Sequence, residues 1–454
     1  MIRVSHPIQK GIEMPNAQNR TINANPTKDF FISMLIKDIG TTRAIIDLVD
    51  NCVDGARRLR GNGNYEGLSI DIEATKDHFQ ISDNCGGIPV DLAREYAFRF
   101  GRPPDMAATP HSVGQFGVGM KRALFKLGKK FRIESRTQTS RFVIQEDVEK
   151  WKQKEKWEFE FLELEPKRKK VPLSETGTTV KVWPLHPTIA ESFSLETFRG
   201  RLATELAEAH IQSTANGLEI VFNGIALHHQ HLVLFQSQRL KPAHRRLVFQ
   251  EGTDRVNVRL YVGIADSDPS SAGWYVFCNG RLVLSADQGI VTGWGETREE
   301  TVPRYHNQFA RFRGYAFFDS QDASLLPWNT TKTGVDSDSP RYRATRLEMV
   351  KLMRPAIDFL NRLDAEKGRE VTDDKPLEAA VKEAKPTGLE NIFQRPLFLA
   401  PKPAVVRSVP QTAHIQYVKP LEQIRRAQKA LKVRTLSAVG EKTFDYFYKR
   451  ECES

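Results

Sequence analysis

The sequence predicts an α+β protein in which two α/β units are followed by a small helical segment. Segments with an apolar residue at every second position, such as SIDIEA and TTVKVW, are typical of half-buried strands. They alternate with segments whose apolar residues recur every three or four positions, which is typical of amphipathic helices. With 454 residues, the chain is long enough for several domains with sizeable cores.

The composition excludes several classes of protein. Hydrophobic residues make up 40% of the chain and charged residues 27%, which is typical of globular proteins. No apolar run approaches about 18 residues, and the N-terminal residues lack the apolar core of a secretory signal. We therefore expect no membrane span and a cytoplasmic location. The four cysteines are scattered without a CxxC pair, which disfavours a disulfide scaffold and a zinc module.

Changes in pattern divide the chain into five parts. Residues 1–27 are polar and turn-rich, as expected of an N-terminal arm. Helical and strand signals alternate over 28–190 and again over 191–363, which predicts two successive α/β domains. Residues 364–414 lose periodicity and collect Pro and Lys, as a linker does. Residues 415–454 are expected to form a basic helical segment.

The first chemical motif, DLVDNCVDGA, lies at 47–56 in a helix expected from Thr41 to Arg60. Asp47, Asn51 and Asp54 are spaced by four and three residues, so they project from one face of that helix. A carboxylate beside an amide suits the activation of a water molecule next to a hard metal ion such as Mg²⁺. A solvated helix face is the alternative for this motif taken alone.

The second motif, ISDNCGGIP at 81–89, places Asp83 at the end of a short strand and before a glycine turn. A buried carboxylate there can accept a hydrogen bond from an exocyclic amine such as that of adenine. Gly86 and Gly87 allow a ring to approach the backbone closely. The alternative is a simple Asx turn at the end of a strand.

The third motif, GQFGVGMKRA at 114–123, spaces three glycines as G-x-x-G-x-G before an apolar helix. Backbone amides at a glycine-rich helix start bind anions, and Lys121 can add a positive charge. The motif is not the GxxxxGK[ST] phosphate loop, and no strand precedes it directly as a dinucleotide fold requires.

Together, the three motifs resemble the N-box and the two glycine boxes of the GHKL ATPases, the group that contains gyrase B, MutL and the MORC (microrchidia) proteins. The resemblance covers about 30–185 and implies a Bergerat-fold ATPase domain, with helices over a mixed sheet, that binds ATP and Mg²⁺. The stretch AFRFGR (97–102), followed by GQFGVGMK, is most similar to the MORC branch.

The resemblance implies a role for each matched residue. Asp47 stands at the position of the general base, and Asn51 at that of the magnesium ligand. Asp83 and Thr178 stand where the family contacts adenine, with Gly87 in the adjoining turn. The remaining nucleotide-binding positions are Asp54, Gly114, Gln115, Phe116, Gly117, Val118, Gly119 and Lys121.

Two positions depart from the family pattern. The base is usually Glu, and Asp47 is shorter by one methylene; Asp50, on the adjacent face of the helix, is a weaker candidate for the base. A carboxylate withdrawn by about 1 Å can cost on the order of 10²-fold in rate, so we expect slow turnover. Cys85 replaces the first glycine of the family's Asp-x-Gly-x-Gly turn, although Gly87 is present.

The second unit is similar to the S5-like transducer domain that follows the ATPase domain in gyrase B, MutL and MORC proteins. FCNGRLVL (277–284) is similar to a transducer strand, and LLPWNTTKTGVD (325–336) to the loop that carries the MORC switch lysine. The resemblance therefore implies that Lys332 contacts the terminal phosphate. An exposed loop lysine is the alternative.

The charge points to a partner for the C-terminal segment. The chain carries a formal net charge of +11, and residues 395–454, with 12 Lys or Arg and five Asp or Glu, supply +7 of it. Such a basic segment suits a phosphate backbone such as that of DNA. A solvated helix face or a protein-binding tail is the alternative.

Two functions follow from the resemblance. The first is a MORC-like ATPase whose ATP-driven dimerisation clamps DNA or a protein partner, which the resemblance associates with prokaryotic defence or DNA maintenance. The second is an ATP-dependent switch with little or no turnover that recruits a partner enzyme.

Overall fold

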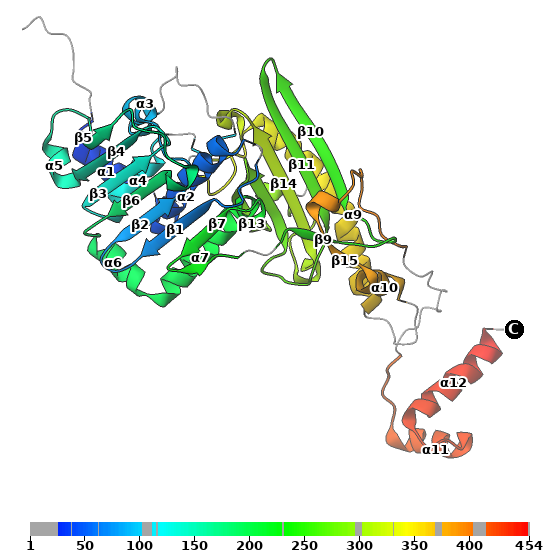
Figure 1. Ribbon diagram of the computed structural model, residues 1–454. Coiled ribbons are helices and arrows are strands. Elements are labelled where there is room, and N and C mark those ends of the chain that lie inside the picture. The colour runs from blue at the N-terminus through cyan, green and yellow to red at the C-terminus, as the bar shows by residue number, and fades with distance from the viewer. Residues whose placement is uncertain are drawn as a thin grey trace, which may run out of the picture. The chain divides into compact units, whose positions relative to one another are not determined.

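The computed structural model describes residues 26–37, 39–61, 63–101, 111–114, 117–228, 231–295, 302–329, 331–367, 375–402 and 415–452 (Figure 1). The chain forms two compact units, Met1–Pro403 and Ala404–Ser454. The predicted α+β class is confirmed by two large sheets and the helices that cover them. None of the helices in the described ranges is long and apolar enough to cross a membrane.

The first sheet of the larger unit has eight strands in the order β5-β4-β3-β6-β2-β1-β7-β8. Neighbours are antiparallel, except that β1 and β7 run parallel. Its strands are β1 (Ser69–Ala74), β2 (Phe79–Asp83), β3 (Lys130–Arg136), β4 (Arg141–Asp147), β5 (Phe161–Glu165), β6 (Gly177–Val182), β7 (Glu219–Phe222) and β8 (Ile225–Ala226).

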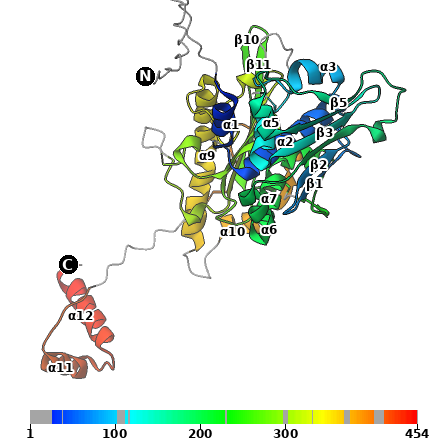
Figure 2. The ribbon, with the colours of Figure 1, turned by 90° about the vertical axis from the view of Figure 1, so that its left-hand side faces the viewer.

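Helices cover one face of this sheet (Figure 2). The predicted helix over 41–60 is confirmed as α2, Thr41–Leu59, which packs against α4. Apolar side chains of α2, among them Ile45 and Leu48, are buried with strand residues such as Ile72 in one core. The helices of this part are α1 (Lys28–Lys37), α2, α3 (Val90–Leu92), α4 (Gly119–Leu127), α5 (Val148–Gln153), α6 (Pro187–Ser194), α7 (Glu196–Ala209) and α8 (Ile211–Ala215).

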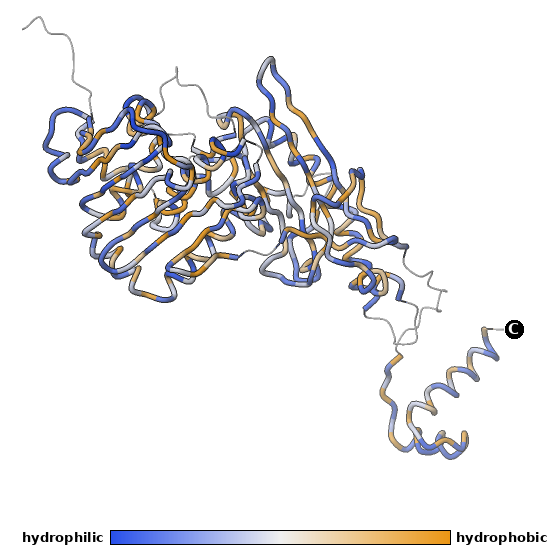
Figure 3. The backbone as a smooth tube through the Cα atoms, viewed as in Figure 1, coloured by the Kyte–Doolittle hydropathy of each residue, from blue (hydrophilic) through white to orange (hydrophobic). Residues whose placement is uncertain are grey.

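The second sheet has five strands in the order β10-β11-β14-β12-β13. Helix α9, Pro340–Lys367, packs on this sheet around Trp274 and Met353. Apolar residues concentrate along these strands and along the first sheet (Figure 3). The strands are β10 (Ala243–Glu251), β11 (Asp254–Ile264), β12 (Gly273–Cys278), β13 (Arg281–Asp287) and β14 (Phe312–Ser320).

Two segments lie where the sequence pattern did not place them. Strands β7 and β8 fall beyond residue 190, yet they extend the first sheet, because β7 pairs with β1. Residues 375–402, inside the expected linker, form α10 (Pro376–Glu383) and β15 (Lys385–Gly388). The strand β15 pairs with β9 (Val233–Gln236), and α10 contacts α9, so this part of the linker is structured. Most of the expected arm, 1–25, lies outside the described residues.

The smaller unit contains the predicted C-terminal helices. They are α11 (Leu421–Leu431) and α12 (Leu436–Glu451), which contact each other. Only Val439 is buried among the described residues of this unit, whereas Phe444, Phe447 and Tyr448 are exposed. The pair therefore has almost no apolar core of its own.

Candidate functional site

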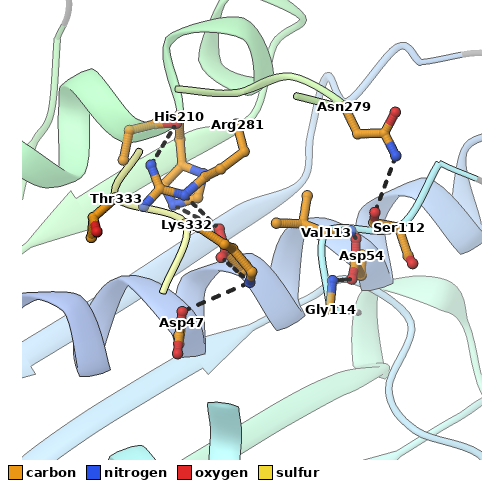
Figure 4. A network of polar contacts seen from close by, with 12 residues as sticks. Asp47, Asp54, Ser112, Val113, Gly114, His210, Asn279, Arg281, Lys332 and Thr333 are labelled. Atoms are coloured by element: carbon orange, nitrogen blue, oxygen red, sulfur yellow. Dashed lines mark hydrogen bonds and ion pairs between the residues drawn. The ribbon is translucent and has the colours of Figure 1, made fainter. Parts of the chain in front are cut away.

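Helix α2 carries three aspartates of the candidate site, and Figure 4 shows two of them, Asp47 and Asp54, with their partners. Asp47, Asp50 and Asp54 are all buried, whereas Asn51 is exposed. Buried carboxylates need charged or hydrogen-bonding partners, because the cost of desolvating an ion is large. Each of the three aspartates has such partners, and they come from different parts of the chain.

Asp47 is paired with a residue that the sequence motifs do not single out. Its Oδ2 atom accepts a hydrogen bond of 2.7 Å from the guanidinium of Arg122, on α4. Its Oδ1 atom lies 3.7 Å from Nζ of Lys332. A Cβ atom added to Gly119 would lie 3.1 Å from Asp47 Oδ2. The candidate base thus lies against the start of α4, with a cation near each oxygen.

Asp54 holds the segment that leads into the glycine box. Its Oδ1 and Oδ2 atoms accept hydrogen bonds of 2.8 Å from the backbone amides of Val113 and Gly114. The same segment is held from the other side, because Asn279, in the turn between β12 and β13, donates to the carbonyl of Ser112 at 3.1 Å. Asp54 therefore positions the loop, and both of its oxygens are occupied by the protein itself.

Asp50 is the centre of a fully buried charge cluster. Its Oδ2 atom accepts a 2.8 Å hydrogen bond from Lys332 Nζ, and its Oδ1 atom lies 3.1 Å from Nε of Arg281. The Nε2 atom of His210 lies 3.7 Å from the same oxygen. Burial alone would raise the pKa of Asp50, but Lys332, Arg281 and His210 together lower it to about 2. Burial lowers the pKa of His210 to about 3, so its imidazole is neutral at neutral pH.

Lys332 reaches this cluster from the loop after β14. It adopts a left-handed backbone conformation with φ of 52°, and its side chain is buried. Burial would lower its pKa, yet Asp50 and Asp47 raise that pKa above its ordinary value. Lys332 is therefore a charged, buried lysine and not an exposed loop residue.

Asp83 lines a pocket on the other side of α2. It ends β2, opposite Thr178 of β6 in the strand register. The pocket is lined by Leu48, Cys52, Gly55, Ile81, Asp83 and Thr178, among other residues. Burial raises the pKa of Asp83 to about 6, although the backbone amide of Cys85 donates to its Oδ1 atom at 2.8 Å. An apolar slot with one carboxylate suits a flat heterocycle that carries an amino group.

Two glycines allow neighbouring backbone segments to approach each other closely beside this pocket. Gly87 has φ of 72°, and an added Cβ would lie 2.3 Å from the carbonyl oxygen of Arg136. Gly177 has φ of 151°, and its Cβ would lie 1.8 Å from the carbonyl oxygen of Asp83. Both the positive φ and the close contacts require glycine at these positions. Cys85 is tolerated in the same turn, where its side chain is buried.

The structure describes only part of the glycine box, GQFGVGMKRA. Gly114, Gly117, Val118 and Gly119 lead into α4, which begins at Gly119, whereas Gln115 and Phe116 lie outside the described residues. Lys121 does not point at an open phosphate site, because its Nζ donates to the carbonyls of Gly117 and Ala97. Burial lowers the pKa of Lys121 to about 7.

The side chains that the structure describes do not form a metal-binding cluster by themselves. Among the described residues, no cluster of three or more His, Cys, Asp or Glu side chains could hold one. The exposed Asn51 is suited to Mg²⁺ that also binds phosphate oxygens, because Mg²⁺ takes few protein ligands in nucleotide sites. Asn51 therefore fits a magnesium–nucleotide complex and not a resident metal.

The sequence motifs missed three residues of the site: Arg122, His210 and Arg281. Arg122 directly follows the glycine-box lysine, so its position was visible but its partner was not. Arg281 lies in FCNGRLVL, which is similar to a transducer strand, and His210 directly follows α7 with no motif around it. Only the tertiary fold shows that these residues converge on α2.

Comparison with known proteins bears on the ATPase part of the chain. No curated protein matches it significantly. Residues 39–178 match the family model described as "Histidine kinase-, DNA gyrase B-, and HSP90-like ATPase". The match runs from just before α2 to Thr178 and so spans the three motifs, but not Lys332 or Arg281. Residues 39–178 therefore match a GHKL-type ATPase domain, and this match supports ATP binding.

Proposed function

We propose that the protein binds ATP with Mg²⁺ and hydrolyses it slowly to ADP and phosphate. One observation carries the proposal: the buried carboxylate of Asp47 lies against Gly119, where the amides of α4 begin. A helix start binds phosphate through its free amides and its dipole. A carboxylate at that point can activate the water that attacks the terminal phosphate.

The remaining roles follow from the placement of each residue. Asp83 and Thr178 bind the amino edge of adenine, with Gly87 below the ring. Asn51 holds Mg²⁺, which supplies charge neutralisation to the phosphates. The second glycine box, Gly114 to Gly119, binds the phosphates through its amides, and Lys121 joins them once it leaves its two carbonyl partners.

Lys332 links nucleotide binding to the second sheet. In the absence of nucleotide, Lys332 lies in the cluster around Asp47 and Asp50. A terminal phosphate bound beside Asp47 would be a further anion that attracts the Lys332 ammonium group. Movement of Lys332 would carry its loop and the second sheet, which acts as the transducer. We infer that this movement drives a MORC-like dimerisation that clamps DNA or a protein partner.

Slow turnover is expected from the state of Asp47. Arg122 occupies one of its oxygens and Lys332 lies near the other, so the carboxylate cannot accept a proton without losing a partner. The shorter side chain adds to this effect. For the same reason, the competing function stays open: an ATP-dependent switch that recruits a partner enzyme and hydrolyses almost nothing.

Steady-state hydrolysis by the purified chain separates the two functions. Asp47→Asn should abolish phosphate release, while the matched control Asp71→Asn, an exposed position on β1, should leave it unchanged. Equal activity in the Asp47→Asn variant would exclude Asp47 as the base. ATP binding without phosphate release by the unaltered protein would favour the switch.

The DNA clamp is tested through the smaller unit. Arg425, Arg426 and Lys429 lie on α11, and deletion of residues 415–454 should weaken DNA binding and flatten its dependence on salt. Size-exclusion chromatography should show a dimer when a non-hydrolysable ATP analogue is present. This dimer should bind DNA more tightly than the nucleotide-free protein does. Unchanged DNA binding after the deletion would exclude this segment as the DNA site.

A further inference from the structure

Arg122 lies inside the candidate active site with one of its donors unused. It is in the first turn of α4, and 8% of its surface is exposed. One guanidinium nitrogen donates to Asp47 Oδ2 at 2.7 Å, while its Nε atom has no hydrogen-bond partner among the described residues. The buried guanidinium is therefore paired with Asp47, and its Nε atom can still donate to a further anion.

The position of Asp47 creates an electrostatic difficulty for phosphate binding. Its Oδ2 atom would be 3.1 Å from a Cβ on Gly119, so the carboxylate lies at the end of α4 that receives the phosphates. An unpaired carboxylate there would repel a polyphosphate strongly, since buried charges are poorly screened. A cation must therefore neutralise Asp47 while nucleotide is bound.

Lys332 is poorly placed to supply that cation. Its Nζ lies 2.8 Å from Asp50 but 3.7 Å from Asp47, and it belongs to a loop of the second sheet. Arg122 belongs to α4 itself, so its contact with Asp47 does not depend on the second sheet. Its planar guanidinium also fixes the direction of the bond, which an ammonium group does not.

We propose that Arg122 is a positioning residue that neutralises Asp47 and fixes its Oδ2 atom. Oδ1, which Lys332 approaches at 3.7 Å, is then the oxygen that takes the proton of the attacking water once Lys332 moves to the terminal phosphate. This inference rests on the proposed ATP site. In it, Arg122 permits ATP binding and sets the orientation of the short carboxylate.

The test is a double-mutant cycle read by equilibrium binding of Mg²⁺–ATP. Arg122→Gln should weaken ATP binding by about tenfold or more, because Asp47 is left unpaired beside the phosphates. Adding Asp47→Asn to that variant should restore the affinity to within about threefold of the unaltered protein. The matched control Lys126→Gln removes a cation two turns into the same helix, away from Asp47, and should bind ATP normally.

Two further readouts separate positioning from simple stability. Arg122→Lys keeps the charge, so it should bind ATP normally but lower kcat with little change in KM. If Arg122→Gln does not fold, the double variant, which has no unpaired charge, still reports on the cycle: near-normal affinity supports the inference, and weak affinity overturns it. Tight ATP binding by Arg122→Gln, or additive effects of the two substitutions, would also overturn it while leaving the ATP site intact. Absence of ATP binding by the unaltered protein would overturn the proposed function itself, and this inference with it.

Discussion

The Nζ atom of Lys332 lies 2.8 Å from Oδ2 of Asp50, although 282 residues separate the two in sequence. The contact joins a loop of the second sheet to helix α2, which lies in the segment that matches the ATPase family model. Arg281, at the start of β13, reaches the same carboxylate from a different strand. A single buried aspartate therefore ties two elements of the second sheet to the helix that carries the candidate base.

Asp50→Asn should lower the free energy of unfolding by about 3–5 kcal/mol at pH 7, because it leaves Lys332 and Arg281 buried without their anionic partner. Urea denaturation followed by circular dichroism measures the change. Asp71→Asn, on the exposed face of β1, is the control and should alter stability by less than about 0.5 kcal/mol. A similar small effect of Asp50→Asn would show that the cluster contributes little to the fold.

The stabilisation from Asp50 should disappear in acid. Its pKa of about 2 in the folded protein lies below the ordinary value of 3.8, so the folded state binds the proton less tightly than the unfolded state. The contribution is therefore fully present above about pH 4 and is lost as the pH falls through about 2. The difference in stability between the unaltered protein and Asp50→Asn, measured by denaturation at pH 7, 4 and 2.5, should be similar at the first two values and smaller at the lowest. A constant difference at all three values would contradict this role.

Asp83 should show the opposite dependence on pH. Burial raises its pKa in the folded protein to about 6, above the ordinary 3.8, so the charged form costs stability. This contribution favours folding below about pH 4 and is lost as the pH rises through about 6. Asp83→Asn should therefore stabilise the protein at pH 7.5 by about 1–2 kcal/mol, yet weaken ATP binding. A variant that is less stable at pH 7.5 would contradict the cost of burying this charge. A variant that binds ATP as well as before would remove Asp83 from the adenine site.

The local parts of this architecture could be predicted from the sequence. Helix α2 follows from its apolar periodicity, and the placement of Asp83 at the end of β2 follows from alternation and the glycine turn. Both depend on neighbours within a few residues. The extension of the first sheet by β7 could not be predicted in this way, because its partner β1 lies about 150 residues earlier in the chain.

The site shows the same limit. Spacing on a helix indicated that Asp47 and Asn51 share a face, but it did not indicate that Asp47 would be covered and Asn51 exposed. That difference arises from Arg122 and Lys332, whose partners are set by packing between elements. Lys121 likewise matches the glycine box in sequence, while its observed partners are backbone carbonyls.

Gly87→Ala should destabilise the protein by about 2–4 kcal/mol and abolish ATP binding. The added methyl group would lie 2.3 Å from the carbonyl oxygen of Arg136, and φ of 72° disfavours any side chain. Gly61→Ala is the matched control, because an added Cβ there meets nothing within 4 Å. Urea denaturation and ATP binding of the two variants measure the effect. Equal stability of the two would show that the turn adapts without cost.

Lys121 provides a direct test of phosphate contact. With a pKa of about 7 in the nucleotide-free protein, its side chain is mostly neutral at pH 8. Contact with a polyphosphate favours the charged form, so its pKa should rise and ATP binding at pH 8 should take up most of one proton. Asp83, with a pKa of about 6, is already ionised at this pH and adds no uptake.

Calorimetric titration with ATP in two buffers of different ionisation enthalpy measures this proton. The uptake should vanish in Lys121→Met and persist in Lys126→Met, which alters a neighbouring lysine that donates to the carbonyl of Ile36. Because the observed partners of Lys121 are the carbonyls of Gly117 and Ala97, phosphate contact requires that these bonds break. Binding without proton uptake would mean that Lys121 keeps those bonds and stabilises the loop before α4, and that the amides of the glycine box bind the phosphates without it.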